Sequence, residues 1–240
     1  MKILQKEYEP VIGANVITRY EKPLYYLDFD NVNESKLDEN NPKKMVCAYT
    51  QKMADLCNKN KTDRILLAGL GGGTIFPAIK PKRKSCLDCV DMSAVVIKQY
   101  KKFFYPVLKD SIDHNLSINI YNIDFESYVD KYKKKYNTIM IDCFKAEGID
   151  ESIFTVFDKL PKILDKDGRI IINIHASRYG EYAENYKKIR KYFNQNLWKV
   201  KTHLSNAKDS YEFGNLIVEL RKNVYKNRFK ISKCFLLPGN

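Results

Sequence analysis

The chain has 240 residues, 44% of them hydrophobic and 12% aromatic, which suffices for the core of one α/β domain with a small N-terminal addition. No segment approaches the run of about 18 apolar residues that a membrane span needs, and no apolar stretch of signal-peptide length opens the chain, so we expect a cytoplasmic protein outside the membrane. The net charge of +13 makes nucleic acid a possible partner, but dispersed lysines without an aromatic-interleaved stripe favour solvated surface faces.

The N-terminal region predicts a β-hairpin followed by a helix. Residues 14–29 are typical of two short strands, and the polar residues 30–42 are typical of a loop. Apolar residues then recur with helical spacing over 43–59. We therefore expect residues 1–60 to form a β-hairpin and helix extension, and residues 61–240 to form a Rossmann-like nucleoside-binding domain.

A short apolar strand then runs into a glycine-rich turn. Its apolar residues predict a buried parallel strand, and the turn holds four glycines, Gly69, Gly71, Gly72 and Gly73. Glycine accepts positive φ angles and lets backbone amides approach a ligand closely. Residues 74–80 are expected to open a helix whose N-terminal amides face the same ligand. Asp91 follows the next strand, about 20 residues on, where a carboxylate can take the ribose hydroxyls of a bound nucleoside.

Strands and helices alternate over the rest of the chain. Strands are predicted at 85–90, 117–123, 138–141, 169–174, 198–204 and 215–220, and helices at 93–104, 125–134, 151–164 and 179–194. Pro106 is expected to help end the helix before it, and Asp167–Gly168 to form a turn. The link between the last two strands is too short for a crossover helix, so these strands should pair antiparallel. The predicted fold is a Rossmann-like α/β sheet of five parallel strands plus an antiparallel C-terminal hairpin, as in class I S-adenosylmethionine-dependent transferases.

Three aspartates share the carboxyl edge of this predicted sheet with the glycines, and ligands of open α/β sheets bind at that edge. Asp91 would hold the ribose, and Asp124 could accept a hydrogen bond from an adenine amino group. Asp142 would lie nearest a reacting sulfonium, where it could orient an amine and take its proton. Phe144, beside Asp142, and His175, at the end of the fifth strand, are further candidates for substrate contact.

The cysteines and histidines do not predict a metal site. Cys86 and Cys89 have the spacing of a zinc or redox pair, but no second pair of Cys or His accompanies them. A strand would also point these two residues to opposite faces. The three histidines are too dispersed for a metal centre, so we expect no metal.

The sequence resembles the spermidine synthase family of polyamine aminopropyltransferases. The segments that carry the resemblance are Leu27–Asn33, Ala48–Met53, Gly69–Gly73, Asp91–Phe104, Asn122–Asp124 and Tyr136–Asp142. The resemblance implies a transferase of polyamine biosynthesis that uses S-adenosylmethionine or its decarboxylated form, with a small-molecule amine as acceptor and a homodimer as a possible assembly. It also implies substrate contacts from Asn33, where the family has Gln, and from Tyr49, in the segment that resembles the family's Tyr-Gln-Glu-Met helix.

One departure concerns the loop after the fourth predicted strand. The family carries Asp-Ser-Ser-Asp-Pro there, with both acids near the polyamine amine, whereas this chain reads Asp142-Cys-Phe-Lys145. A lysine in place of the second acid suits a polycation less well. Two other functions therefore stay open: an S-adenosylmethionine-dependent methyltransferase with another acceptor, and a non-catalytic scaffold that binds nucleic acid or a partner.

Overall fold

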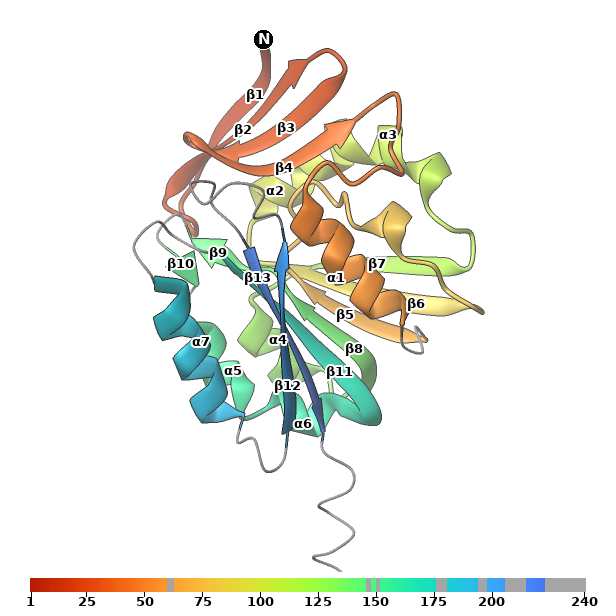
Figure 1. The fold of residues 1–240 in the computed structure, drawn as a ribbon. Coiled ribbons are helices and arrows are strands. Elements are labelled where there is room, and N and C mark those ends of the chain that lie inside the picture. Colours follow the sequence, from red (N-terminus) through yellow and green to blue (C-terminus); the bar gives the residue numbers. More distant parts are fainter. Residues whose placement is uncertain are drawn as a thin grey trace, which may run out of the picture.

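The structure, a computed structural model, is built around a seven-stranded sheet (Figure 1) and describes residues 1–59, 63–145, 148–149, 152–175, 181–193, 198–205 and 215–222. Across the sheet the strands are β12 (Trp198–Ser205), β13 (Asn215–Lys222), β11 (Leu164–His175), β8 (Tyr136–Ile141), β5 (Arg64–Ala68), β6 (Ser85–Asp91) and β7 (Leu116–Asn122). The strands from β11 to β7 are parallel, and β13 pairs antiparallel with both β11 and β12. The predicted sheet of five parallel strands with an antiparallel C-terminal hairpin is confirmed.

A separate antiparallel sheet precedes this domain and lies at the top of Figure 1. Its strands, paired in chain order, are β1 (Lys2–Glu9), β2 (Ala14–Glu21), β3 (Leu24–Phe29) and β4 (Val32–Asp38). The hairpin predicted over 14–29 is confirmed as β2 and β3. The loop predicted over 30–42 is wrong, because β4 continues the sheet. Only Ser35 and Leu37 of β4 are buried, so its many polar positions concealed the alternation of a strand.

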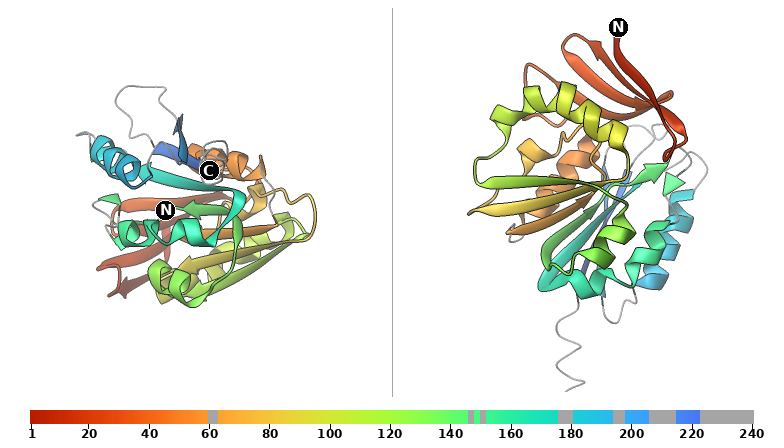
Figure 2. Two further views of the ribbon diagram at one scale, coloured as in Figure 1. Left: turned by 90° about the horizontal axis from the view of Figure 1, so that it is seen from below. Right: turned by 180° about the vertical axis from the view of Figure 1, so that it is seen from behind.

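Helices cover both faces of the central sheet (Figures 1 and 2). One face packs against α1 (Ala48–Asn58), the 3₁₀ turn η1 (Phe76–Ala78) and the helical stretch α2 (Ala94–Gln99), η2 (Tyr100–Phe104) and α3 (Tyr105–Leu108), which ends in η3 (Lys109–Ser111). The other packs against α4 (Phe125–Lys131), α5 (Ser152–Phe157), α6 (Leu160–Ile163) and α7 (Glu181–Tyr192). Neighbouring residues of β5 point to opposite faces of the sheet: Leu67 packs in the core on one face and Leu66 in the core on the other. Because both faces are buried, the strand is a continuous apolar run.

The helix end predicted at Pro106 and the turn predicted at 167–168 are both wrong, because the regular structure continues through these residues. Pro106 does not end the helix before it, because η2 is a π-helical turn and Pro106 lies in the first turn of α3, where its missing amide is not needed. The turn predicted at 167–168 lies within β11. The pairing of β11 with β8 shifts register between Leu164 and Arg169, and this irregularity accommodates Gly168 without ending the strand.

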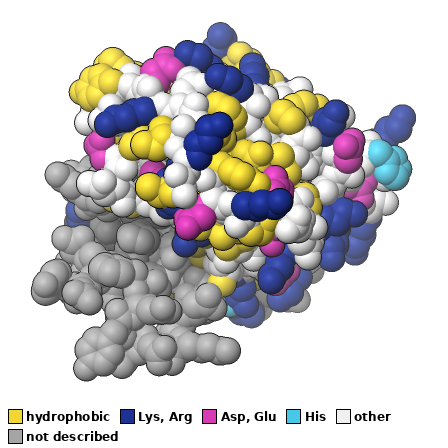
Figure 3. Space-filling model, turned by 90° about the horizontal axis from the view of Figure 1, so that it is seen from above, with side chains coloured by type: hydrophobic (Ala, Val, Ile, Leu, Met, Phe, Trp, Pro, Cys, Tyr) yellow, Lys and Arg dark blue, Asp and Glu magenta, His cyan; other side chains and the backbone are white. Residues whose placement is uncertain are grey.

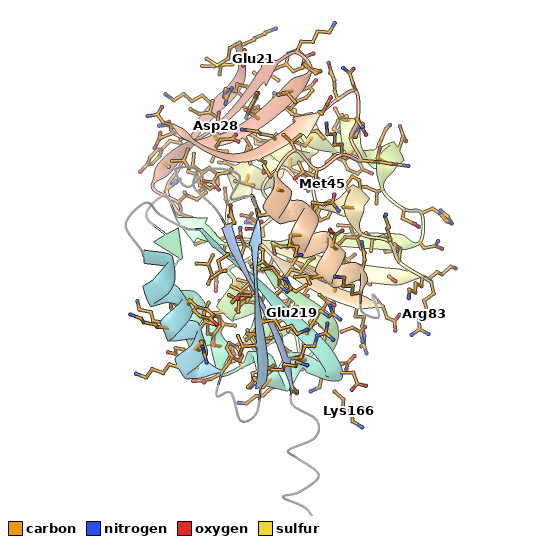
Figure 4. The ribbon with its side chains drawn as sticks, in the orientation of Figure 1. Glu21, Asp28, Met45, Arg83, Lys166 and Glu219 are labelled. Atoms are coloured by element: carbon orange, nitrogen blue, oxygen red, sulfur yellow. The ribbon has the colours of Figure 1, made fainter. Side chains whose placement is uncertain are left out.

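A buried ion pair, of which Figure 4 labels Glu219, fastens α1 to the sheet. Arg169 of β11 lies 3.0 Å from the carboxylate of Glu219 in β13 and donates a 2.6 Å hydrogen bond to the carbonyl of Leu56 in α1. Both charged side chains are almost fully buried, and their pairing offsets the cost of removing them from water. The first turn of α1, which carries Tyr49, is thereby held at the carboxyl ends of the strands.

The surface over the N-terminal sheet carries mixed side chains. Figure 3 shows Lys and Arg on this face interspersed with acidic and hydrophobic side chains. Whether the chain binds nucleic acid stays a prediction, as does its division near residue 60. Within the described part of the chain, each helix is too short or too polar to span a bilayer.

Candidate active site

A cavity of about 370 Å³ opens at the carboxyl ends of the central parallel strands. Its volume falls in the range of small-molecule sites, and this edge is where an open α/β sheet binds ligands. The central domain contributes the loop after β5 and the ends of β6, β7 and β8. The N-terminal sheet contributes four side chains to the opposite wall: Ile12, Phe29, Glu34 and Ser35.

Gly69 brings the loop after β5 into close backbone contact with the loop after β8. Its φ is +95°, and a Cβ at this position would lie 2.1 Å from the carbonyl oxygen of Asp142. The amide of Gly69 donates to Val90 of β6, and the amide of Asp142 donates to Ala68 of β5, each at 2.9 Å. Three strand ends are thus fixed relative to one another, and a larger residue at position 69 would displace Asp142.

The remaining glycines of the loop divide between cavity and core. Gly71 lines the cavity, whereas side chains at Gly72 and Gly73 would meet the rings of Phe104 and Tyr100. The amide of Gly72 donates a 2.9 Å hydrogen bond to the Oγ of Ser35, which ties the glycine loop to the N-terminal sheet.

The helix expected after the glycine loop is wrong. Only the single turn η1 forms there, because Pro81 disfavours helical backbone at Lys80 and removes the next amide. A ligand therefore meets loop amides and side chains at this point of the cavity, and no helix N-terminus.

Asp91 ends β6 with both carboxylate oxygens bonded to backbone amides. Its Oδ2 accepts from Leu70 and its Oδ1 from Ser93, both at 2.9 Å. Burial raises the pKa of the Asp91 carboxyl in spite of these hydrogen bonds. Each oxygen keeps a further lone pair, so Asp91 can hold the glycine loop and accept ligand hydroxyls together.

Asp124 lines the cavity and caps the helix that follows β7. Its Oδ1 accepts a 2.8 Å hydrogen bond from the amide of Ser127. Burial opposes ionisation here, but the hydrogen bonds from Ser127 and its neighbours outweigh it and lower the pKa of Asp124. Asp124 is therefore an ionised acceptor at the cavity wall.

Asp142 follows β8, the strand between β5 and β11. Its Oδ1 accepts a 2.8 Å hydrogen bond from Asn173, whose own oxygen accepts one of 3.0 Å from Asn215. Burial raises the pKa of Asp142 to about 6. The carboxylate is thus largely ionised at neutral pH, with a pKa close enough to 7 for proton acceptance.

Tyr49 and Glu34 share this end of the cavity with Asp142. Burial and the neighbouring Asp142 raise the pKa of Tyr49, which keeps its hydroxyl protonated. Burial, then the charges of Asp142 and Asp28, raise the pKa of Glu34 to about 7. Sequence reasoning predicted Tyr49 and missed Glu34, because the segment that carries Glu34 was expected to be a loop.

The tip of the β1–β2 hairpin closes another side of the cavity. Glu9 is buried and accepts hydrogen bonds from the Oγ of Ser93 at 2.6 Å and the amide of Val95 at 3.1 Å, at the start of α2. These bonds hold Ile12 at the cavity, near the segment that carries Asp91. The polar sequence of β1 gave no signal for this contact.

Three other predicted substrate contacts, Asn33, Phe144 and His175, stay predictions. Asn33 is exposed, and its amide donates to Asp28 at 2.8 Å and to the carbonyl of Ser35 at 3.2 Å, within the N-terminal sheet. The backbone of Phe144 begins β9 (Phe144–Lys145), which pairs with β10 (Gly148–Ile149), and His175 ends β11; both side chains lie outside the described part of the structure. Among the described residues, no three His, Cys, Asp or Glu side chains gather as a metal site would require.

Comparison with protein-family models finds a match over most of the chain. The model of the spermine/spermidine synthase domain matches residues 46–207, well over half of the chain. The matched segment includes α1, the glycine loop and the strand ends that carry Asp91, Asp124 and Asp142. The N-terminal sheet precedes it.

Curated relatives are polyamine aminopropyltransferases. The protein of Methanocaldococcus jannaschii is 30% identical over 122 residues, covering 50% of this chain and 41% of the relative. The protein of Vibrio vulnificus is 24% identical over 204 residues, covering 74% of this chain and 66% of the relative. The aligned part of the chain thus spans less than half of the first relative's length and about two thirds of the second's.

Solved structures share the fold at low sequence identity. A spermidine synthase in complex with the transition-state analogue AdoDATO superposes with a TM-score of 0.66 and 14% identity, covering 92% of this chain and 73% of that one. A probable spermidine synthase from Corynebacterium glutamicum gives 0.65, also at 14% identity, covering 91% and 79%. A putative rRNA methylase from Clostridium thermocellum gives 0.53 at 11% identity, covering 75% and 99%. These similarities establish the class I transferase fold.

Proposed function

Because the chain belongs to the spermine/spermidine synthase domain family, we propose that its cavity transfers an aminopropyl group from decarboxylated S-adenosylmethionine to a small-molecule amine. The curated relatives carry out polyamine aminopropyl transfer by name, and one solved relative of the same fold holds the analogue AdoDATO. The proposal is tied to the geometry by one observation, the order of polar groups along the sheet edge.

That order matches the parts of an adenosyl sulfonium nucleoside. In neighbouring strands the edge carries Asp124 after β7, Asp91 at the end of β6, the glycine loop after β5 and Asp142 after β8. A nucleoside lying along this edge would direct its adenine amino group to Asp124 and its ribose to Asp91. The chain of the sulfonium would then pass Gly69 and Gly71 toward Asp142.

The charge at the Asp142 end supports the decarboxylated donor over S-adenosylmethionine. Glu34 and Asp142 both lie there, and a donor carboxylate would be repelled by them. A donor whose chain ends in an ammonium is attracted. This observation favours aminopropyl transfer over methyl transfer.

In the proposed reaction Asp142 is the base. The lone pair of a neutral amine attacks the propyl carbon attached to sulfur, the C–S bond breaks, and its electron pair stays on sulfur. The thioether methylthioadenosine leaves, and the proton lost from nitrogen passes to the Asp142 carboxylate. The pKa of about 6 suits this group to accept that proton near neutral pH.

Mass spectrometry tests the proposal directly. The protein is incubated with each sulfonium donor, with and without putrescine, and methylthioadenosine and S-adenosylhomocysteine are followed. We expect methylthioadenosine only from the decarboxylated donor, only with an amine present, and at least about 100-fold less from Asp142→Asn. Formation of S-adenosylhomocysteine would show a methyltransferase, and the absence of both products with a panel of diamines would overturn the proposal.

A further inference from the structure

Glu34 reaches the cavity because β4 carries a β-bulge at this residue. In the pairing of β3 with β4, Leu27 lies opposite Ser35 and Asp28 lies opposite Asn33, so Glu34 has no partner in β3. A bulge redirects the side chains around it, and bulges are frequent beside active sites. Here Glu34 and Ser35, which a regular strand would point to opposite faces, both line the cavity.

Glu34 makes no hydrogen bond or ion pair with the described residues, unlike the other acids around it. Asp28 is neutralised by Arg19 at 2.5 Å and bonded to Asn33. Lys36, two residues along β4, lies near the thiol of Cys47 and 5.8 Å from the ring centre of Tyr26. The charge that Glu34 meets across the cavity is Asp142, whose hydrogen-bond partner, Asn173, is neutral.

Glu34 and Asp142 face each other without a cation between them, in a cavity otherwise walled largely by apolar groups. This arrangement indicates which kind of cationic ligand the cavity would bind. Tyr49, Cys47 and Cys143 are the other titratable groups near Asp142, and burial raises the pKa of Tyr49 and of Cys47, so that both stay protonated. A metal ion would need more oxygen ligands than these two acids supply. An alkylammonium needs a few acceptors for its N–H groups and an apolar wall for its methylenes, and Phe29 lies on this wall.

We propose that Glu34 and Asp142 bind the acceptor amine between them, with Glu34 supplying the second carboxylate that the loop after β8 lacks. The inference rests on the proposed function and names the acceptor as a primary alkylammonium. Asp142 accepts one proton from the bound ammonium, which frees the nitrogen lone pair for attack, while Glu34 holds the remaining N–H groups in place. The attack then leaves the product nitrogen as a secondary ammonium. The acid pair is thus drawn from two sheets, one residue from the loop after β8 and one from the bulge in β4.

Binding of putrescine to the protein saturated with methylthioadenosine tests the inference by calorimetry. We expect Glu34→Gln to weaken putrescine binding at pH 8 by at least about tenfold, the loss of a charge-assisted contact. The affinity for methylthioadenosine itself should not change. Glu21→Gln, which removes an exposed acid of the same sheet (Figure 4), is the matched control and should leave both affinities unchanged.

The pH dependence gives a readout that a merely structural role would not move. The ammonium binds the ionised carboxylate, so the group with a pKa of about 7 must release its proton as putrescine binds below that pH. Putrescine affinity of the unaltered protein should therefore rise about twentyfold from pH 6 to pH 8, about tenfold from ionisation of Glu34 and about twofold from that of Asp142. In Glu34→Gln only Asp142 remains, with a pKa of about 6, and the rise should be about twofold.

The outcomes separate this inference from the proposed function. If methylthioadenosine binds but Glu34→Gln keeps both the putrescine affinity and its pH dependence, the role of Glu34 is refuted and the transferase proposal stands. If the unaltered protein does not bind methylthioadenosine, the proposed function fails and the inference fails with it. Glu34→Asp, which keeps the charge on a shorter side chain, should restore the pH dependence in part if the carboxylate is what matters.

Discussion

Replacing Gly69 by alanine should both destabilise the protein and disturb the cavity. The backbone at this residue has φ +95°, which costs an L-residue about 1–2 kcal/mol. The new Cβ would lie 2.1 Å from the carbonyl oxygen of Asp142, far inside van der Waals contact, and that neighbour is backbone that cannot rotate away. Relief requires the loop after β8 to move, which weakens the hydrogen bond from Asp142 to Ala68 at about 1 kcal/mol or more.

The expected total for Gly69→Ala is at least about 2–3 kcal/mol of unfolding free energy, a large part of the stability of a typical domain. Urea denaturation measures it, and Gly13→Ala is the control. Gly13 also has a positive φ, +75°, but a Cβ there meets nothing within 4 Å, so this variant should lose only about 1 kcal/mol. Equal losses in the two variants would refute the argument that contact between the β5 and β8 loops, and not φ alone, requires glycine.

Three further outcomes are expected. Folding raises the pKa of the Glu34 carboxyl from 4.5 to about 7, so its ionisation destabilises the native state as the pH rises through that window. Glu34→Gln lacks this carboxyl. The unfolding free energy of the variant, minus that of the unaltered protein, should therefore be about 1–3 kcal/mol larger at pH 8 than at pH 5. Urea denaturation measures both proteins at both pH values, and the same difference in unfolding free energy at pH 5 and pH 8 would contradict this expectation. Asp91→Ala should weaken methylthioadenosine binding by about 1.5–3 kcal/mol in calorimetry, and unchanged affinity would place the ribose elsewhere. Glu9→Gln should lower the thermal midpoint by several degrees, because a buried carboxylate that accepts from Ser93 and Val95 is lost; an unchanged midpoint would show that the hairpin tip is held by other contacts.

The central domain was predictable because its signals are local. The apolar run before Gly69 marks a strand buried on both faces, and the short link between the last two strands excludes a crossover helix. The positions of Asp91, Asp124 and Asp142 at strand ends follow from the same alternation of elements. The rule that parallel strands present their carboxyl ends on one edge then brings the three acids together without any knowledge of tertiary contacts.

The wall opposite was not predictable, because its signals are tertiary. β4 is mostly polar because only two of its seven positions are buried, and its acid Glu34 reaches the cavity through a bulge, which alternation cannot reveal. The loss of an acid at Lys145 therefore suggested a pocket poorer in negative charge than the one that the structure contains. Asn33 matches a family motif by position, and its amide donates to Asp28 and to the carbonyl of Ser35 within the N-terminal sheet, so its contact with substrate stays a prediction.

The hydrogen bond from Gly72 to Ser35 joins two walls of the cavity that come from different parts of the chain. The family match begins at residue 46, whereas Ile12, Phe29, Glu34 and Ser35 all precede it. Under the proposed function, substitutions in the first 45 residues would change the acceptor side of the cavity and leave the nucleoside side intact, provided that this contact, the Glu9 anchor and the hydrogen bonds of Gln99 to β2 persist. Chimeras that exchange the first 45 residues between relatives, with these contacts kept, would then be a route to new amine acceptors.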